Sequence, residues 1–393
     1  MKTVYLDHCA TTPVHPDVLA AMLPFLRDSF GNPSSAHTLG KKAREAVEEA
    51  RGKVAALIGA NASEIVFTSG GTEADNLAIQ GIARVRKDRG NHIVTSAIEH
   101  HAVLRACEYL ARNGFTVTYL PVDHHGVVNP EAVNKALTDK TILVTIMHSN
   151  NEVGTIEPIG EIGRITAERG VAFHTDAVQS VGKVPINVKE LQVDLLSIAA
   201  HKLYGPKGIG ALYIKEGIRI DPIIYGGEQE KGMRSGTENV ASIAGLGKAC
   251  ELAMETVAVR MDDIRKMSDA FQERISAALP DLVINGHPVS KLPNCLSVSV
   301  PVIMAEMIVR DLDARGIAVS AGSACTSHSV EISHVLAAMG LPKEIAQGTV
   351  RFSLGITNTP EEMEYAATAF VEVVDKLKTL SEIEDSLGSR RCY

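Results

Sequence analysis

The sequence predicts an α/β fold, with a large domain built on a mainly parallel sheet and a smaller α+β domain after it. Short apolar runs alternate with longer stretches of helical periodicity. Most of the short runs are largely apolar without a polar residue at every second position, which is typical of strands buried on both faces of a parallel sheet. The length of 393 residues fits two domains or one large one, at roughly 100–200 residues per domain.

Seven strand-like runs are expected in the large domain. They lie at residues 65–68, 93–96, 116–120, 142–147, 171–174, 194–199 and 209–214. Only residues 200–208 separate the last two runs, which is too short for a parallel crossover. We therefore expect these two strands to be antiparallel and joined by a loop that contains His201 and Lys202.

Helical segments connect the earlier strands and the two domains. Apolar residues between positions 39 and 58 repeat at three- and four-residue steps, which predicts one buried helix face. A long helical stretch without proline runs from about residue 240 to 278 and is expected to link the domains. Beyond it we expect a strand at 295–300, a helix, a glycine-serine loop, a strand at 350–354 and a last helix. The predicted large domain is 14–260, and 1–13 with 261–393 form the predicted small domain.

Composition and charge exclude several classes of protein. Apolar residues make up 45% and charged residues 22%, as in folded globular chains. The formal net charge of −8 disfavours nucleic acid as a partner, because phosphate binding requires a basic surface. No run approaches the roughly 20 apolar residues of a membrane span, and Asp7 comes too early for a secretory signal. We expect a cytoplasmic protein.

Cysteine and histidine positions give no metal site. The six cysteines are scattered without a CxxC pair, so neither a zinc site nor a disulfide framework is expected. The adjacent pairs His100-His101 and His124-His125 are expected to point their side chains in different directions, so a shared metal is disfavoured.

The best anion-binding candidate is the segment Thr68-Ser69-Gly70-Gly71-Thr72-Glu73-Ala74. It follows a strand and opens a helix, where backbone N–H groups and the helix dipole favour an anion. A plain helix cap explains the segment equally well. P-loop and dinucleotide motifs are absent from the sequence or out of order.

Two further residues suggest a cofactor. Lys202 follows an apolar strand within a short loop, where a lysine that loses its solvent can form a Schiff base. Asp176 ends a buried strand, at the edge where open α/β sheets bind ligands. Taken singly, a solvated lysine and an Asp helix cap remain alternatives. Together with the anion segment, the two residues suggest pyridoxal phosphate, which needs a phosphate site, an acid at its ring nitrogen and a lysine.

Cys325 is the cysteine with the most reactive setting. It lies among small polar residues in Ser320–Ser329, a segment expected to be exposed. Cys107, Cys250 and Cys295 lie in apolar or helical contexts, which favours inert core thiols. Cys9 is open to either interpretation.

The whole pattern resembles the group I cysteine desulfurases of the NifS/IscS type, within the fold-type I pyridoxal-phosphate enzymes. The resemblance covers nearly the whole chain and is specific. Its motifs are Tyr5-Leu6-Asp7, Ala10-Thr11-Thr12-Pro13, Gly31-Asn32-Pro33-Ser34-Ser35, Ser69-Gly70-Gly71-Thr72-Glu73, Glu99-His100, Asn150-Asn151-Glu152, Asp176-Ala177-Val178-Gln179-Ser180, His201-Lys202, Arg234-Ser235-Gly236-Thr237, Gly322-Ser323-Ala324-Cys325 and Arg351-Phe352-Ser353-Leu354-Gly355.

This resemblance implies the cofactor contacts. Lys202 would hold pyridoxal phosphate covalently and later move protons. Asp176 would pair with the pyridine nitrogen, and Gln179 would bond the ring hydroxyl. His100 would stack on the ring and act as acid or base.

The resemblance also implies a phosphate site and a dimer. Gly71, Thr72 and His201 would hold the phosphate, with Thr237 reaching across from the other subunit of a homodimer. Ala199 stands where many relatives have a phosphate-binding serine. The backbone of Ala200, or water, would then replace that contact.

The implied reaction converts L-cysteine to L-alanine. Asn151, beside the cofactor, and Arg351 would bind the substrate carboxylate, and Cys325 would attack the substrate sulfur to become a persulfide. An iron–sulfur scaffold or another acceptor protein would then take the sulfur, and a scaffold could share a cluster through Cys325. The C-terminal tail differs from the tail with which some relatives dock a scaffold, so the acceptor is left open. His328 could tune the thiol, although a surface histidine is the simpler interpretation.

Four alternatives remain. A selenocysteine lyase or group II desulfurase is the nearest, but the extended segment around Cys325 favours group I. An aminotransferase would share Asp176 and Lys202 without needing Cys325. A non-enzymatic sulfur carrier or regulator would need only the thiol.

Overall fold

The computed structural model describes residues 3–322 and 332–388. Its helices are α1 (Pro16–Arg27), α2 (Thr38–Leu57), α3 (Gly71–Val85), α4 (His101–Arg112), α5 (Pro130–Ala136), α6 (Ile159–Glu168), α7 (Val240–Ala278), α8 (Ala305–Asp313), α9 (His334–Ala338), α10 (Lys343–Ala346) and α11 (Pro360–Gly388). Its strands are β1 (Val4–Tyr5), β2 (Ile65–Thr68), β3 (His92–Ser96), β4 (Thr116–Leu120), β5 (Thr141–Thr145), β6 (Ala172–Asp176), β7 (Leu195–Ala199), β8 (Gly210–Ile214), β9 (Val283–Asn285), β10 (Cys295–Ser299), β11 (Ile317–Ala318), β12 (Ser320–Ala321) and β13 (Thr349–Ser353).

The large sheet has seven strands in the order β2-β8-β7-β6-β5-β3-β4. The pairs β3/β4, β3/β5, β5/β6 and β6/β7 are parallel, whereas β7/β8 and β2/β8 are antiparallel. All seven predicted strands are confirmed to within a few residues, and so is the antiparallel pair around Lys202.

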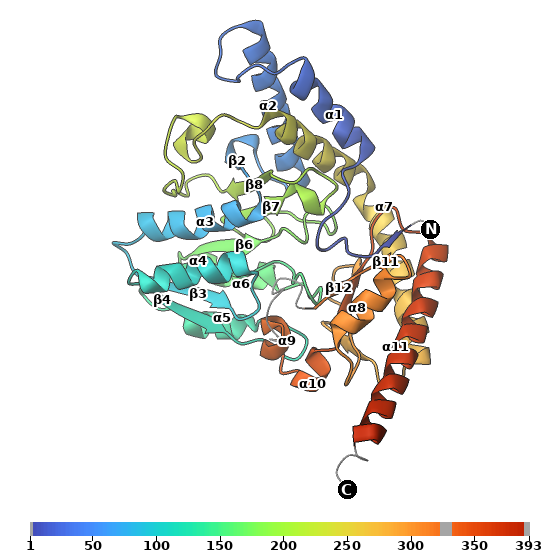
Figure 1. Ribbon diagram of the computed structural model, residues 1–393. Helices are drawn as coiled ribbons and strands as arrows, with labels where there is room; N and C mark the ends of the chain where they lie inside the picture. The colour runs from blue at the N-terminus through green and yellow to red at the C-terminus, as the bar shows by residue number, and fades with distance from the viewer. Residues whose placement is uncertain (1–2, 323–331, 389–393) are drawn as a thin grey trace.

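Helices cover both faces of this sheet, as Figure 1 shows. Successive strand residues point to opposite faces, so Val66 belongs to the core under α3 and α4, while Phe67 belongs to the core under α2, α6 and the first half of α7. Burial on both faces explains why most of these strands are largely apolar.

The long helix α7 joins two cores. Its first half contributes Ile243 and Leu246 to the core of the large sheet, and its second half contributes Phe271 and Ile275 to a second core. The second core lies against a four-stranded antiparallel sheet, in the order β12-β13-β10-β9, and against α8 and α11.

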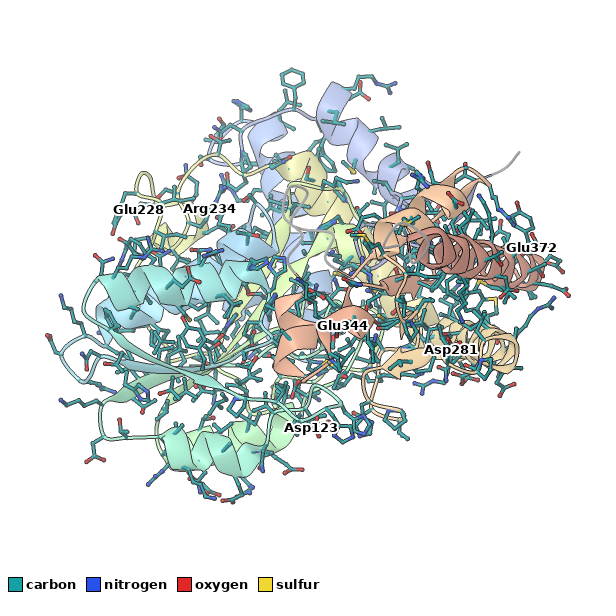
Figure 2. The ribbon with its side chains drawn as sticks, turned by 60° about the horizontal axis from the view of Figure 1, so that its bottom comes forward. Asp123, Glu228, Arg234, Asp281, Glu344 and Glu372 are labelled. Carbon is teal, nitrogen blue, oxygen red and sulfur yellow. The ribbon has the colours of Figure 1, made fainter. Side chains whose placement is uncertain are left out.

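The N-terminal segment runs between these two parts of the molecule. Strand β1 pairs in parallel with β11, beside the small sheet, and the chain then passes the end of the large sheet to reach α1. Charged side chains such as Glu228, Asp281 and Glu372 project from the periphery (Figure 2). Within the described ranges, no helix is both long and apolar enough to cross a membrane.

Candidate active site

Lys202 lies at the turn that the sequence predicted. It ends a short 3-10 helix (Ala200–Lys202) that directly follows β7. Its Nζ donates to the backbone carbonyls of Cys9 at 2.6 Å and Ala10 at 2.8 Å. Burial, reinforced by the nearby charge of Lys183, lowers the pKa of Lys202 to about 8. The amine is therefore easier to deprotonate than an exposed lysine, as a nucleophilic amine requires.

Asp176 is the last residue of β6, which neighbours β7 in the sheet. Its side chain is buried, and its Oδ1 accepts a hydrogen bond from the Val178 N–H at 2.9 Å. Burial raises the pKa of Asp176, while His100 and Lys202 act to lower it. These electrostatic couplings indicate that the three predicted residues face one region.

Asp75, on α3, belongs to the same cluster although sequence reasoning missed it. Asp75, His100 and Asp176 offer ligand atoms that all lie within 4.8 Å of one another, a spacing that could hold a metal ion. Asp75 Oδ1 is buried without a hydrogen-bond partner among the described residues and lies 3.6 Å from His174 Nε2. Burial and the charge of Asp176 raise the pKa of Asp75 well above its ordinary value, so the two carboxyls resist being ionised together.

His100 caps the N-terminus of α4. Its Nδ1 accepts a hydrogen bond from the Ala102 N–H at 3.2 Å, so the neutral ring carries its proton on Nε2. Burial lowers the pKa of His100. The neutral ring can therefore offer an N–H donor from Nε2, next to Asp176.

The predicted anion segment forms a tight turn into α3. Among the described residues no side chain caps the first turn of α3. A Cβ atom at Gly71 would lie 2.7 Å from Val178 Cγ2, so the backbone there passes closer to its neighbour than any other residue would allow. The same Cβ position would lie 3.7 Å from the Cβ of Ala199. Ala199, which stands where many relatives have a serine, is therefore beside this turn.

The other predicted phosphate contacts stay predictions. The Ala200 N–H donates to the Ile209 carbonyl at 3.1 Å, which favours water as the replacement for the missing serine. His201 Nδ1 is 3.2 Å from Thr11 Oγ1. Thr237 is exposed on the loop before α7.

Gln179 is buried with both ends of its amide engaged. Its Nε2 donates to the Cys9 carbonyl at 2.9 Å, and its Oε1 accepts from Lys183 Nζ at 3.1 Å. Lys183 is another buried residue that sequence reasoning missed. Because Nε2 carries two N–H groups, Gln179 can contact a ring hydroxyl while it keeps its bond to the Cys9 carbonyl.

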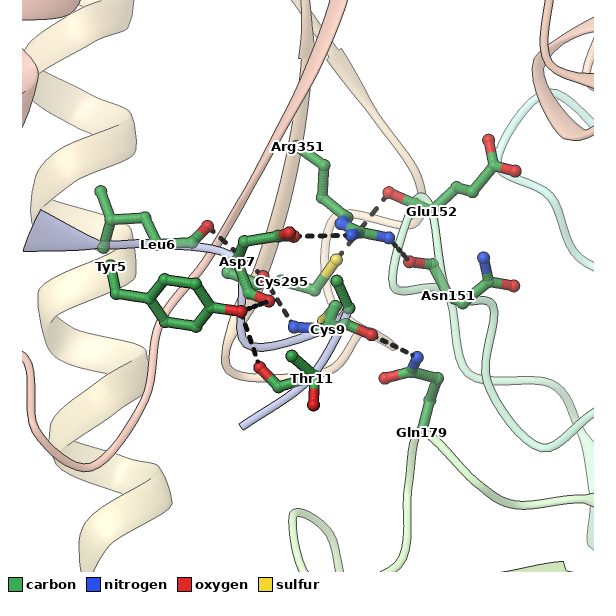
Figure 3. A network of polar contacts seen from close by, with 12 residues as sticks. Tyr5, Leu6, Asp7, Cys9, Thr11, Asn151, Glu152, Gln179, Cys295 and Arg351 are labelled. Atoms are coloured by element: carbon green, nitrogen blue, oxygen red, sulfur yellow. Dashed lines mark hydrogen bonds and ion pairs between the residues drawn. The ribbon is translucent and has the colours of Figure 1, made fainter. Parts of the chain in front are cut away.

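Arg351 and Asn151 are brought together, as expected (Figure 3). Arg351 Nη1 donates to the Asn151 carbonyl at 2.7 Å, and Nη2 pairs with Asp7 Oδ1 at 2.8 Å. The Nε of Arg351 is buried and has no partner among the described residues. Asp7 and Asn151 thus hold the guanidinium from two sides and engage two of its five N–H donors.

Cys325 lies outside the described residues, as do His328 and Cys392. The segment that contains Cys325 is bounded by two described anchors. Before it, β12 pairs with β13, and Ser320 stands opposite Arg351. After it, Ser333 Oγ donates to Glu152 Oε2 at 2.5 Å. Both anchors are next to the Arg351–Asn151 pair.

The histidine pairs differ from expectation. The rings of His124 and His125 lie with their centroids 3.9 Å apart, so the prediction that adjacent histidines diverge is wrong here. Neither belongs to the group with metal-ligand spacing. Cys107 and Cys250 are confirmed as core thiols, and burial raises the pKa of each to about 12.

Comparison with known proteins identifies the family. Residues 4–365 match the class-V aminotransferase family. The chain is 50% identical to the cysteine desulfurase IscS of Dictyoglomus turgidum over 380 residues, covering 97% of this chain and 96% of that protein. A solved NifS-like protein is 41% identical, with a TM-score of 0.90, and covers 95% of this chain and 100% of its own. The structure of SspA in complex with cysteine is 40% identical, with a TM-score of 0.80, and covers 91% and 100%.

These matches span nearly the full length of this chain and of the proteins that it matches. They include the sheet, the turn at Lys202 and the strand of Arg351. The chain therefore belongs to the class-V aminotransferase family and, within it, to the cysteine desulfurases of the IscS/NifS type.

Proposed function

We propose that this chain is a homodimeric enzyme that uses pyridoxal phosphate to remove sulfur from L-cysteine, giving L-alanine and a persulfide on Cys325. The observation that carries the proposal is the convergence at the edge of the large sheet. There a buried lysine amine, a buried strand-end carboxylate and a buried arginine with a free donor lie around one segment.

The residues present fit pyridoxal phosphate. The uncapped first turn of α3, approached closely at Gly71, suits a phosphate group, because free backbone N–H groups point outward there. Thr72 follows Gly71 in that turn. Lys202 would hold the cofactor through its amine, and Asp176 would face the pyridine nitrogen. The bound cofactor supplies an electron sink for charge that develops on the substrate.

Lys202 and His100 are suited to moving protons. The lowered pKa of Lys202 lets its amine both accept and return a proton near neutral pH. His100 carries its proton on Nε2, because its Nδ1 is held by the α4 backbone. The buried carboxylate of Asp176 favours a protonated ring nitrogen opposite it.

Arg351 and Asn151 position the substrate. The guanidinium is fixed by Asp7 and the Asn151 carbonyl, so its remaining N–H donors can bind a carboxylate with little loss of entropy.

Cys325 is the proposed nucleophile. Its thiolate would attack the sulfur of the bound cysteine, so that the substrate C–S bond breaks and a new S–S bond forms on Cys325. Support comes from the two anchors of its segment, at Ser320 beside Arg351 and at Ser333 on Glu152. An acceptor protein, such as an iron–sulfur scaffold, would then take the sulfur from the persulfide.

The homodimer is supported by one apolar surface. Leu19, Leu23 and Leu26 of α1 are 49%, 52% and 63% exposed, and Phe30 is 70% exposed. A row of exposed apolar side chains of this kind is typical of an interface.

The exposed Thr237 lies on a loop held by the ion pair of Arg51 with Glu230, at 2.7 Å. Light scattering should give twice the chain mass, and Leu23→Asp should reduce it toward one chain.

Two variants with matched controls test the activity. Cys325→Ser should lose sulfide release from L-cysteine in the presence of a thiol reductant but keep the visible absorbance of the cofactor. Lys202→Ala should lose that absorbance. Cys392→Ser and the exposed Lys207→Ala are the controls and should behave as wild type. Persulfide formation at the wild-type rate in Cys325→Ser would show that the nucleophile is assigned wrongly.

A further inference from the structure

Cys9 and Cys295 are far apart in the sequence, and both lie next to Ser353 of β13. The Cys9 N–H donates to Ser353 Oγ at 2.8 Å. Ser353 is also the residue directly opposite Cys295 in the antiparallel pair β10/β13. The two cysteines pack in one small buried cluster, each 1% exposed, and Figure 3 shows them next to each other.

The two thiols do not have equal environments. Asn294 Nδ2 donates to Cys9 Sγ at 3.8 Å. The Cys295 thiol donates to the Glu152 carbonyl at 3.9 Å. The Cys9 sulfur thus accepts a hydrogen bond from an amide, whereas the Cys295 thiol donates to a carbonyl.

Buried cations reinforce this asymmetry. The neighbouring Cys295 thiol, followed by the charges of Lys183, Arg351 and Lys202, lowers the pKa of Cys9 well below its ordinary value although burial opposes the shift. The neighbouring Cys9 and burial raise the pKa of Cys295. A thiolate next to a thiol is the arrangement from which a disulfide forms, because the thiolate reacts first and the neighbour then resolves it.

We propose that Cys9 and Cys295 form a second thiol site, separate from Cys325, that a peroxide oxidises to an intramolecular disulfide. The Cys9 thiolate attacks one peroxide oxygen, which breaks the O–O bond and gives a sulfenic acid and one water after protonation. The Cys295 thiol then attacks the Cys9 sulfur, loses its proton and displaces the second oxygen as water. Two thiols lose two electrons and two protons, and one hydrogen peroxide becomes two waters.

This site is connected to the candidate active site through the backbone of Cys9. Its carbonyl accepts from Lys202 Nζ at 2.6 Å and from Gln179 Nε2 at 2.9 Å. A disulfide would bring the two neighbouring sulfurs to a covalent length of about 2 Å. The strain of that movement falls on the segment that holds the Lys202 amine. Oxidation is therefore expected to change the environment of Lys202, independently of the state of Cys325.

Peptide mapping tests the proposal on the cofactor-loaded full chain. Cys325→Ser is used beside wild type, so that oxidation of Cys325 does not confuse the result. The folded protein is treated with hydrogen peroxide, alkylated under denaturing conditions and digested without reductant. A Cys9–Cys295 linked peptide is expected, with two fewer free thiols, and dithiothreitol should restore both. Cys107 and Cys250 should stay alkylatable, because burial raises their pKa values.

Single variants and the cofactor spectrum provide further readouts. Cys295→Ala should leave a Cys9 sulfenic acid that dimedone traps, whereas Cys9→Ala should leave Cys295 reduced. In Cys325→Ser, oxidation should shift the visible absorbance of the cofactor, and dithiothreitol should reverse the shift. Alkylation of both Cys9 and Cys295 after a peroxide treatment that fully oxidises wild-type Cys325 would overturn the proposal. So would a linked peptide that forms only when the protein is unfolded before oxidation.

Discussion

Replacing Arg351 with lysine tests the proposed carboxylate site most directly. In the structure one N–H of Nη1 donates to the Asn151 carbonyl at 2.7 Å and one N–H of Nη2 donates to Asp7 at 2.8 Å, out of five N–H donors on the guanidinium. A lysine keeps the charge, but its single ammonium cannot reproduce this fork. Arg351→Lys therefore loses at least one charge-assisted hydrogen bond to the substrate, of about 1.5–3 kcal/mol.

That loss corresponds to a decrease in kcat/KM of about 10- to 150-fold, at 1.4 kcal/mol per factor of ten. The assay is alanine formation at varied L-cysteine concentration, with a thiol reductant to discharge the persulfide. Most of the loss should appear as a higher KM, and the cofactor absorbance should not change. Arg315→Lys, at an ion pair with Glu372 away from the site, should retain wild-type kinetics. A kcat/KM for Arg351→Lys within about threefold of wild type would refute the assignment.

Two further predictions concern buried groups near the site. Burial raises the pKa of Glu99 from 4.5 to about 8, so the folded chain holds the carboxyl proton of Glu99 more tightly than the unfolded chain does. The stability of the wild-type protein therefore falls as pH rises from about 4.5 to 8. Glu99→Gln cannot titrate, so its stability relative to wild type should grow with pH in this window, by about 1.4 kcal/mol per unit in denaturant unfolding; parallel pH profiles would contradict this. Ala199→Ser would add a hydroxyl beside the turn at Gly71, and we expect cofactor to bind about 3- to 10-fold more tightly in a fluorescence titration, as one hydrogen bond of about 0.5–1.5 kcal/mol predicts. Unchanged or weaker binding would show that Ala199 does not face the phosphate.

Local sequence predicted the strands well and the smaller elements poorly. Six strands of the large sheet are buried at every position, so their largely apolar character is visible without knowledge of their neighbours, whereas the edge strand β4 is partly exposed. The strands β1, β11 and β12 have only two residues each, which is too short for any pattern. Strand order was not predicted from the local pattern, because β2 joins β8 rather than β3 through pairing that spans more than a hundred residues.

Asp75 is a site residue whose burial could have been predicted from the sequence. It is four residues before Ile79 and seven before Ile82, both fully buried, so it stands on the apolar stripe of α3. An acid on such a stripe is expensive to bury and therefore marks a functional or structural cluster. The position of Asp75 next to Asp176 could not be predicted from one helix, because it depends on how α3 packs on the sheet.

The N-terminal segment has more importance for the site than its sequence indicates. Three buried or half-buried cations, Lys183, Lys202 and Arg351, surround residues 7–10, and only Arg351 has a carboxylate partner there among the described residues. Lys202 instead relies on two backbone carbonyls from this segment. Buried cations held by neutral oxygens attract anions, so a phosphate and a substrate carboxylate are favoured at this place. The same excess of positive charge favours the Cys9 thiolate, because Lys183, Arg351 and Lys202 each lower the pKa of Cys9. Electrostatic attraction for an anionic substrate and the reactivity of a second thiol thus have one physical cause.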